Sequence, residues 1–400
     1  MNARPTLAGA RWGVRPPDQR FDDIEGLKQA ISSRRGRART LSFSPDRVRA
    51  LPGREGIVLD LDGEVMVPTA YAASQLSRAV GLPAAAVQVL SPELGAAALN
   101  ERIERTGDKP GGFPRGATLL LEDQPDGPAR LRGLQSGSYG RTWDIDVVEA
   151  LVEPLMEAGF VPAAASVGAP DQNLALFSSD RDLFCFLVHA DPDAWLPTPH
   201  GRPLKRGIVI RNSEVGGISL QLRAFWFDSF CTNHMVFGGA LAVELSEAHR
   251  AGQQSPLDRL LDRWSQVGGL DCLAGSTAAE QGVMARASRL IVAERGDSLR
   301  QMEVAAADAV ALLAGRARVR TYLPRKLLRA GARRARVYAA ARSPEATRTL
   351  DERDACDFPG PGISLWHMAC GITEVSQEQS LHTDQRAQVD VAIGRVLAVA

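Results

Sequence analysis

The spacing of apolar residues divides this chain into strand pairs and helices. Short apolar runs separated by turn residues predict β-hairpins over 56–67, 116–136, 173–190 and 206–227. The first hairpin turns at Asp62-Gly63, and Asp-Gly between two apolar runs is the strongest short hairpin signal. The N-terminal half is therefore expected to be rich in antiparallel sheet.

Apolar residues that recur every three to four positions predict helices between and after these hairpins. The predicted helices cover 69–83, 91–104, 144–159, 276–296 and 297–315. Ser91 followed by Pro92 begins one of them, and Gly159 ends another. A short helix is also expected at 23–31. The arginines that follow it are interpreted as loop or tail: Arg34, Arg35, Arg37 and Arg39.

Strands with interleaved helices, followed by mostly helices, indicate an α+β fold with a largely antiparallel sheet. Three parts are predicted. Residues 1–54 form an Arg/Pro-rich, partly disordered segment, and residues 55–240 form an α+β sheet domain. Residues 241–400 form a helical region packed on that sheet.

The composition is that of an ordinary soluble globular protein, with 44% hydrophobic and 24% charged residues in 400. Basic and acidic residues number 47 each, so only local charge can indicate an anionic partner. The chain shows no leader-like apolar segment and no long uncharged apolar stretch, so no membrane partner is expected. Five cysteines without a CxxC pair indicate a reducing, cytoplasmic location.

The hairpin at 206–227 predicts a sheet with two chemically different faces. A five-residue loop at 213–217 would pair Ile210 with Leu220 and Ile208 with Leu222, all on the core face. The opposite face would then carry Arg211, Ser219, Gln221, Arg223, Phe225 and Phe227. Guanidinium groups beside phenyl rings are typical of single-strand binding surfaces. Alternatively, a helix covers this face and the phenylalanines belong to the core.

A second candidate for anion binding lies near the C-terminus. Ten basic residues and no acidic residue occur between Arg316 and Arg342. If 324–343 is helical, one stripe of that helix carries Arg325, Arg329, Arg333 and Arg336. Like charges at this spacing disfavour an isolated helix, so their presence favours a phosphate-bearing partner. Alternatively, the stripe is only a solvated face of an arginine-rich chain.

Several segments resemble the phage/plasmid-like protein family, a domain-of-unknown-function family of phages, plasmids and bacterial genomes. They include "LRGLQSGSYGRTWDIDVVEALV", "GIVIRNSEVGGISLQLRAFWFDSFCTNHMV" and "SLWHMACGITEVSQ". The family motif Asn-Ser-Glu-x-Gly is matched by Asn212, Ser213, Glu214 and Gly216. The motif Cys-x-Asn-Gly-Met is matched by Cys231, Asn233 and Met235, with His234 in place of the glycine. The resemblance implies a role in mobile elements but no established activity.

The common catalytic motifs for phosphate binding, dinucleotide binding, nucleophilic serine and zinc hydrolysis do not occur in the sequence. Cys231 and His234 are two ligands at most, and zinc needs three or four. No metal and no cofactor are therefore expected. Cys231 is interpreted as a buried thiol beside a turn in which Asn233 caps backbone groups.

Three functions fit these observations. The first is a nucleic-acid-binding accessory protein that binds or anneals single strands. The second is an enzyme with an unrecognised site near Asn212, Glu214, Cys231 and Asn233. The third is a protein-interaction module, for example one acting against host defence. A homo-oligomer is compatible with all three.

Overall fold

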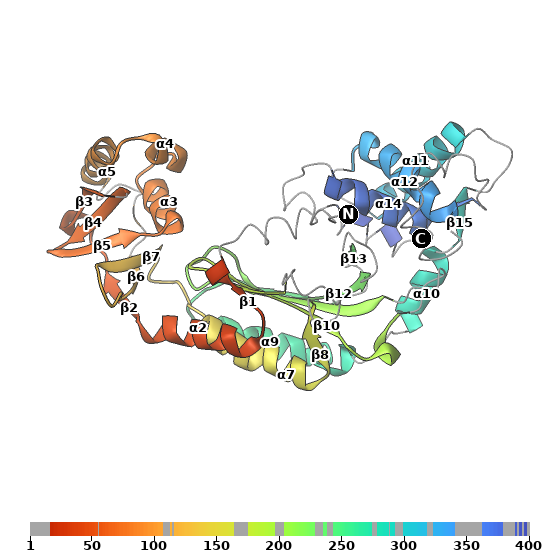
Figure 1. Cartoon of the computed structure of the whole chain (residues 1–400), viewed down its shortest axis with the longest axis horizontal. Coiled ribbons are helices and arrows are strands. Elements are labelled where there is room, and N and C mark those ends of the chain that lie inside the picture. Colours follow the sequence, from red (N-terminus) through yellow and green to blue (C-terminus); the bar gives the residue numbers. More distant parts are fainter. Residues whose placement is uncertain are drawn as a thin grey trace.

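The computed structural model confirms the α+β fold and divides it into a lobe, a body and a C-terminal helical part (Figure 1). The residues that it describes are 17–54, 56–106, 113, 116–163, 175–196, 204–228, 235–237, 243–273, 278–287, 289–292, 299–317, 323–340, 362–378, 389, 392–393 and 396–397. Each of the three parts has its own cluster of buried apolar side chains.

The lobe is a six-stranded sheet with three helices on one face (Figure 1). Its strands are β2 (Ala38–Ser42), β3 (Val48–Gly53), β4 (Gly56–Leu61), β5 (Glu64–Pro68), β6 (Thr118–Glu122) and β7 (Ala129–Gln135), in the order β2-β6-β7-β5-β4-β3. Its helices are α3 (Ala70–Ala79), α4 (Ala84–Val89) and α5 (Pro92–Thr106). All pairs are antiparallel except β5 with β7.

The predicted Asp-Gly hairpin is confirmed as the β4–β5 turn. Asp62 and Gly63 both have positive φ, 53° and 87°, as a two-residue type I′ turn requires. Ser91 and Pro92 begin α5 as predicted, and Ser91 Oγ accepts from Leu94 N (3.3 Å). The pattern therefore predicted these local structures correctly because their signals are contained in adjacent residues.

The body is an eight-stranded antiparallel sheet. Its strands are β1 (Arg20–Phe21), β8 (Phe160–Pro162), β9 (Leu176–Ser178), β10 (Leu183–His189), β11 (Lys205–Asn212), β12 (Leu220–Asp228), β13 (Met235–Phe237) and β14 (Glu244–Glu247). The path runs β1-β9-β10-β11-β12-β13, with β8 also on β10 and β14 also on β12. Short 3-10 turns occur at Pro17–Gln19, Pro45–Arg47, Pro192–Ala194 and Asp271–Leu273.

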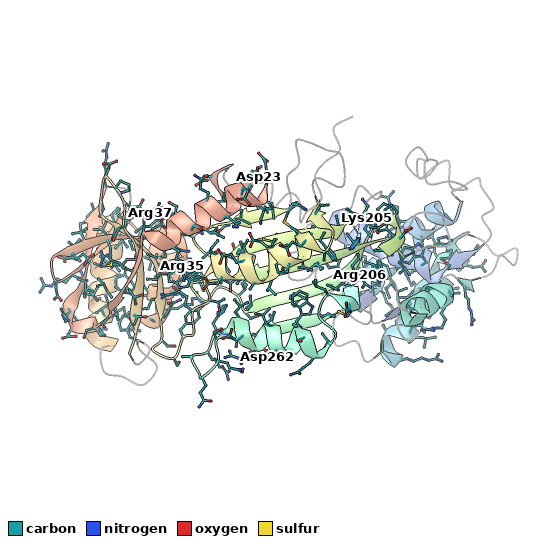
Figure 2. The ribbon with its side chains drawn as sticks, turned by 90° about the horizontal axis from the view of Figure 1, so that it is seen from below. Asp23, Arg35, Arg37, Lys205, Arg206 and Asp262 are labelled. Atoms are coloured by element: carbon teal, nitrogen blue, oxygen red, sulfur yellow. The ribbon has the colours of Figure 1, made fainter. Side chains whose placement is uncertain are left out.

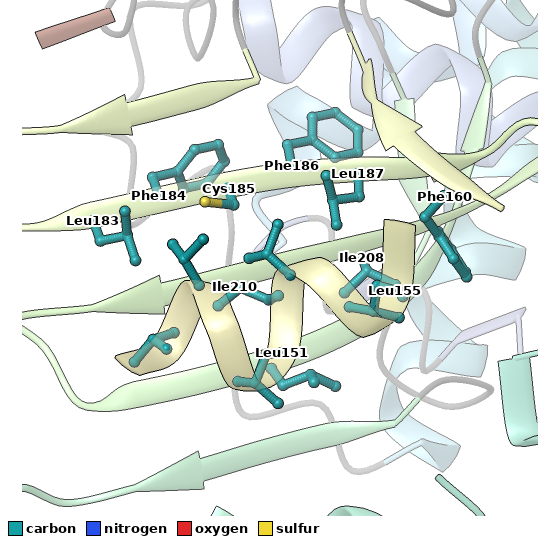
Figure 3. Close-up of a cluster of buried hydrophobic side chains, with 14 of the residues drawn as sticks. Leu151, Leu155, Phe160, Leu183, Phe184, Cys185, Phe186, Leu187, Ile208 and Ile210 are labelled. Atoms are coloured by element: carbon teal, nitrogen blue, oxygen red, sulfur yellow. The ribbon is translucent and has the colours of Figure 1, made fainter. Parts of the chain in front are cut away.

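Helices cover one face of this sheet (Figures 1 and 2). They are α2 (Ile24–Gly36), the segment α6 (Asp144–Val147), η3 (Val148–Val152) and α7 (Glu153–Glu157), and α9 (Pro256–Gln266). Leu183 and Leu187 of β10 point toward Leu151 and Leu155 of this helical segment (Figure 3). Phe184 and Phe186 point to the other face of the sheet (Figure 3).

The helix at 144–157 contains one turn of π-helix, η3, just before Pro154. A proline inside an α-helix removes a hydrogen bond and clashes with the preceding turn, so local widening relieves both effects. The helix prediction at 144–159 is confirmed, and the chain leaves it through Gly159 with φ 92°.

The C-terminal part contains α10 (Ala278–Ala287), β15 (Leu290–Val292), α11 (Leu299–Arg316), α12 (Arg325–Ala340), β16 (Ile363–Ser364) and α14 (Leu365–Glu378). The helix predicted over 276–296 is therefore too long, because 290–292 form a strand that pairs with β16. In the described part of the chain, the helices are all too short or too polar to cross a bilayer.

The strands are distributed between the two large sheets in a way that does not follow the predicted boundaries at residues 54 and 240. Residues 38–53 of the expected partly disordered segment form β2 and β3 of the lobe sheet, and the strands of 55–240 belong to two sheets. The loop or tail prediction for the first arginine cluster is wrong, because Arg34 and Arg35 lie in α2 and Arg39 lies in β2.

Ion pairs connect α2 and this arginine cluster to neighbouring elements. Along α2, Lys28 pairs with Glu153 and Arg35 with Asp146, both on the adjacent helical segment. Arg37 lies at the lobe end of α2 (Figure 2) and pairs with Glu122 of the lobe (2.6 Å).

Candidate functional site

The core face of the central hairpin is as predicted, but its register is not. Ile208, Ile210, Leu220 and Leu222 are all fully buried in the body core. Ile210 pairs with Leu222 and Ile208 with Ala224, so the strands are shifted by two residues relative to the prediction. Because side chains alternate with a period of two, this shift leaves every residue on its predicted face.

On the opposite face of this hairpin, the side chains that the structure describes are buried or paired; the Phe227 side chain lies outside the described part. The Phe225 ring is 3% exposed, contacts Phe186 (ring centroids 5.3 Å apart) and covers Gly207 on the facing strand. Arg223 pairs with Glu244 on β14 (2.9 Å), and Arg211 is half-buried. Phe225 is therefore a core residue, as the alternative interpretation expected, but it lies on the same side of the sheet as Phe186, away from the body helices (Figure 3).

The Asn-Ser-Glu-x-Gly residues form a buried polar cluster where the lobe meets the body. Glu214 Oε2 pairs with Arg132 Nη1 of β7 (2.6 Å), and both side chains are almost completely buried. Glu214 Oε1 accepts from the backbone N of Asp144, the first residue of α6 (3.0 Å). A carboxylate at this position satisfies a free helix N–H group and interacts favourably with the helix dipole.

Asp144 is the second buried carboxyl group of this cluster, and its cation is more distant than that of Glu214. Its closest cation is Arg34, with Nη1 4.0 Å from Asp144 Oδ2. Asn212 Nδ2 donates to Asp144 Oδ1 (2.7 Å) and to Thr142 O (2.9 Å). Burial, followed by repulsion from the Glu214 carboxylate, raises the pKa of Asp144 to about 8. The burial thus favours the protonated, neutral form of Asp144.

The loop at 213–217, after β11, packs against the lobe and does not line an open pocket rim. Val215 is fully buried against the lobe, where it lies opposite Gly133, and its carbonyl accepts from Gln75 Nε2 of α3 (3.0 Å). Gln135 Nε2 donates to Glu214 O (2.6 Å), and Tyr139 Oη donates to Ser213 O (2.7 Å). The structure thus assigns Asn212 and Glu214 to a joint between two sheets, and Gly216 (φ 84°) to its turn.

The other family-motif candidates, Cys231 and Asn233, lie outside the described residues, as does His234. The predicted inert thiol and asparagine cap therefore stay predictions. In the described part of the chain, histidine, cysteine and carboxylate side chains do not gather in groups of three or more that could hold a metal.

The predicted basic stripe is on α12, and most of it is exposed. Arg325, Arg329 and Arg333 lie one turn apart on the solvent side, without an ion-pair or hydrogen-bond partner among the described residues. Arg336 differs, since its side chain is only 13% exposed and pairs with Glu303 of α11 (3.1 Å). The stripe thus presents three accessible guanidinium groups instead of four.

Packing against α14 holds this face outward. The opposite side of α12 buries Leu327, Leu328, Ala332 and Ala335 in the C-terminal core. Gly331 of α12 meets Gly371 of α14, where an added Cβ on either glycine would overlap with backbone atoms of the other helix. Such a close crossing leaves α12 little freedom to rotate, so the arginines are fixed on the surface.

No family model, no curated protein and no solved structure matches this chain. The resemblance to the phage/plasmid-like family stays a prediction from the sequence motifs.

Proposed function

We propose that this protein binds nucleic acid, as a single-strand binding or annealing accessory protein of mobile elements, and that the α12 arginines contact phosphates. The observation that carries the proposal is the exposure of Arg325, Arg329 and Arg333 on one face of α12. The mobile-element context rests on the family resemblance alone.

The charge on this face is not neutralised within the part of the chain that the structure describes. Helix α12 contains no acidic residue, and the three arginines follow each other at four-residue spacing. Repulsion at this spacing disfavours the helix by a few tenths of a kcal/mol for each pair, and packing of the apolar side against α14 offsets it. An anionic backbone along the helix would remove the repulsion.

The test is fluorescence anisotropy with a labelled single-stranded oligonucleotide at several salt concentrations. Each phosphate neutralised on a single strand contributes about −0.7 to the slope of log K against log salt. Replacing all three arginines by Gln should weaken binding and reduce the slope by up to about 2, since Arg336 is paired within the protein. A matched duplex tests the strand preference.

A control variant removes the same charge from the lobe. Arg49 of β3, Arg54 directly after β3 and Arg105 of α5 are also exposed. Strand β3 and helix α5 lie at the end of the molecule opposite to α12 (Figure 1). Their replacement by Gln should leave the slope unchanged. Absence of binding by the parent protein at low salt would refute nucleic-acid binding, and an equal loss in both triple variants would refute a role for α12.

A further inference from the structure

The lobe is an insertion in the body. The chain enters it directly after α2, at Arg37, and returns to the body through 136–143, before α6. The two crossings lie side by side, because Arg141 Nη1 on the second donates to Thr40 Oγ1 of β2 beside the first (3.2 Å). Hinges between separately packed units consist of a few loop or element-terminal residues, and both crossings are of this kind.

The contact between the hairpin loop and the lobe is polar and depends on side chains. The lobe and the body have separate apolar cores. Within the described residues, the loop at 213–217 is held to the lobe by hydrogen bonds and an ion pair from Gln75, Arg132 and Gln135 and by the contact of Val215 with Gly133. Interfaces of this polar kind allow relative motion of domains, unlike large apolar ones.

We infer that the lobe is a hinged domain and that the loop at 213–217 is its latch, closed by the buried Arg132–Glu214 pair. Both charges have left water, and this desolvation offsets much of their attraction. The closed state is therefore specific in geometry but only moderately stable. Removal of one partner leaves an uncompensated buried charge, which solvent can relieve when the lobe swings away.

Limited trypsin digestion tests the latch, because opening would expose the second crossing. Arg141 in that crossing is half-buried: it donates to Gln135 Oε1 and lies over the Trp143 ring (5.1 Å to the ring centroid). Glu214→Gln should speed cleavage after Arg141 more than about tenfold, because loss of one buried partner exceeds the free energy that corresponds to a factor of ten. In this variant, the lobe and the body should each still unfold cooperatively on heating.

Two further variants keep the test decisive. Arg132→Gln combined with Glu214→Gln restores charge balance and should return cleavage toward the wild-type rate. Gln75→Ala removes the lobe–loop hydrogen bond to Val215 O, and one within the lobe from Leu134 N, without leaving a buried charge. It therefore serves if Glu214→Gln does not fold, and should give a smaller selective increase. Glu303→Gln, which breaks an ion pair in the C-terminal part, is the control and should change nothing at Arg141.

The inference is wrong if Glu214→Gln folds and is cleaved after Arg141 at the wild-type rate. It is also wrong if cleavage increases equally at sites throughout the chain, since the pair would then belong to one cooperative unit. If Glu214→Gln does not fold, unchanged cleavage of Gln75→Ala refutes the latch.

Discussion

Replacing Gly371 by Ala should test the crossing that orients the arginine face. Gly371 lies in α14 where this helix passes Gly331 of α12. A Cβ built on Gly371 would overlap with the Gly331 carbonyl oxygen and stand 2.7 Å from the Ala335 nitrogen. Both neighbours are backbone atoms, so a rotamer change cannot relieve the contact and the helices must separate.

Two opposite effects determine the magnitude. Alanine in the interior of a helix is favoured over glycine by about 1 kcal/mol. Overpacking of a close contact costs about 1–3 kcal/mol, and the upper half of that range applies because the contacted atoms belong to backbone. The net expectation is a loss of about 1–2 kcal/mol, confined to the C-terminal part.

Native-state hydrogen exchange measures this loss locally, through the opening free energies of the α12 and α14 amides. Gly282→Ala in α10 is the matched control, because its added Cβ would have only an ordinary contact with Arg286, 3.5 Å away. The control should be stabilised by up to about 1 kcal/mol. Stabilisation of Gly371→Ala by the same amount would show that the two helices do not meet at these glycines.

Three further predictions concern the lobe and the body. Leu222→Ala should destabilise by about 2–5 kcal/mol because Leu222 is fully buried, and a loss below about 0.5 kcal/mol in urea titrations would contradict its place in the core. Asn100→Ala should cost about 1–3 kcal/mol, because the Asn100 amide binds both Ala50 N (2.7 Å) and Ala50 O (2.8 Å) on the edge strand β3; unchanged hydrogen exchange at Ala50 would argue against this pairing. Asp144→Asn should remove one pH-dependent contribution to stability. Because the pKa of Asp144 is raised by folding from 3.8 to about 8, its contribution is fully present below 3.8 and is lost as pH rises toward about 8, by at most about 1.4 kcal/mol per pH unit. Parallel curves for the two proteins between pH 5 and 8 would refute that assignment.

The sequence predicted the hairpins, the two faces of β11 and β12 and most helices, because each signal is local. It did not predict the register of β11 with β12. A shift of two residues keeps all side chains on the same faces, so the hydrophobic pattern cannot distinguish the two registers. The difference arises in the loop, where Ser213 Oγ accepts from Gly217 N (2.7 Å) and donates to Arg181 O (2.6 Å).

The buried cluster could not be found from spacing. Arg132 lies in the lobe sheet and Glu214 in the loop after β11 of the body, far apart in the chain, and in the sequence each of them has the pattern of an ordinary surface charge. The resemblance singled out Asn212 and Glu214 as motif residues, and the structure shows that they hold a joint. The sequence did not determine whether Phe225 is buried either. Alternation shows which residues share a face of the strand, but not whether the second face is covered or exposed.

The two arginine clusters show that local sequence charge does not by itself predict an anion-binding surface. Both clusters are runs of basic residues in the sequence: one covers Arg34 to Arg39, and the other lies in α12. In the first, Arg35 pairs with Asp146 and Arg39 with Glu64 and Asp123, so its charge is neutralised within the fold. In the second, Arg325, Arg329 and Arg333 have no such partner among the described residues. Of these two clusters, only the α12 face therefore remains a candidate for the proposed phosphate binding, and Arg336 is excluded from it because it pairs with Glu303.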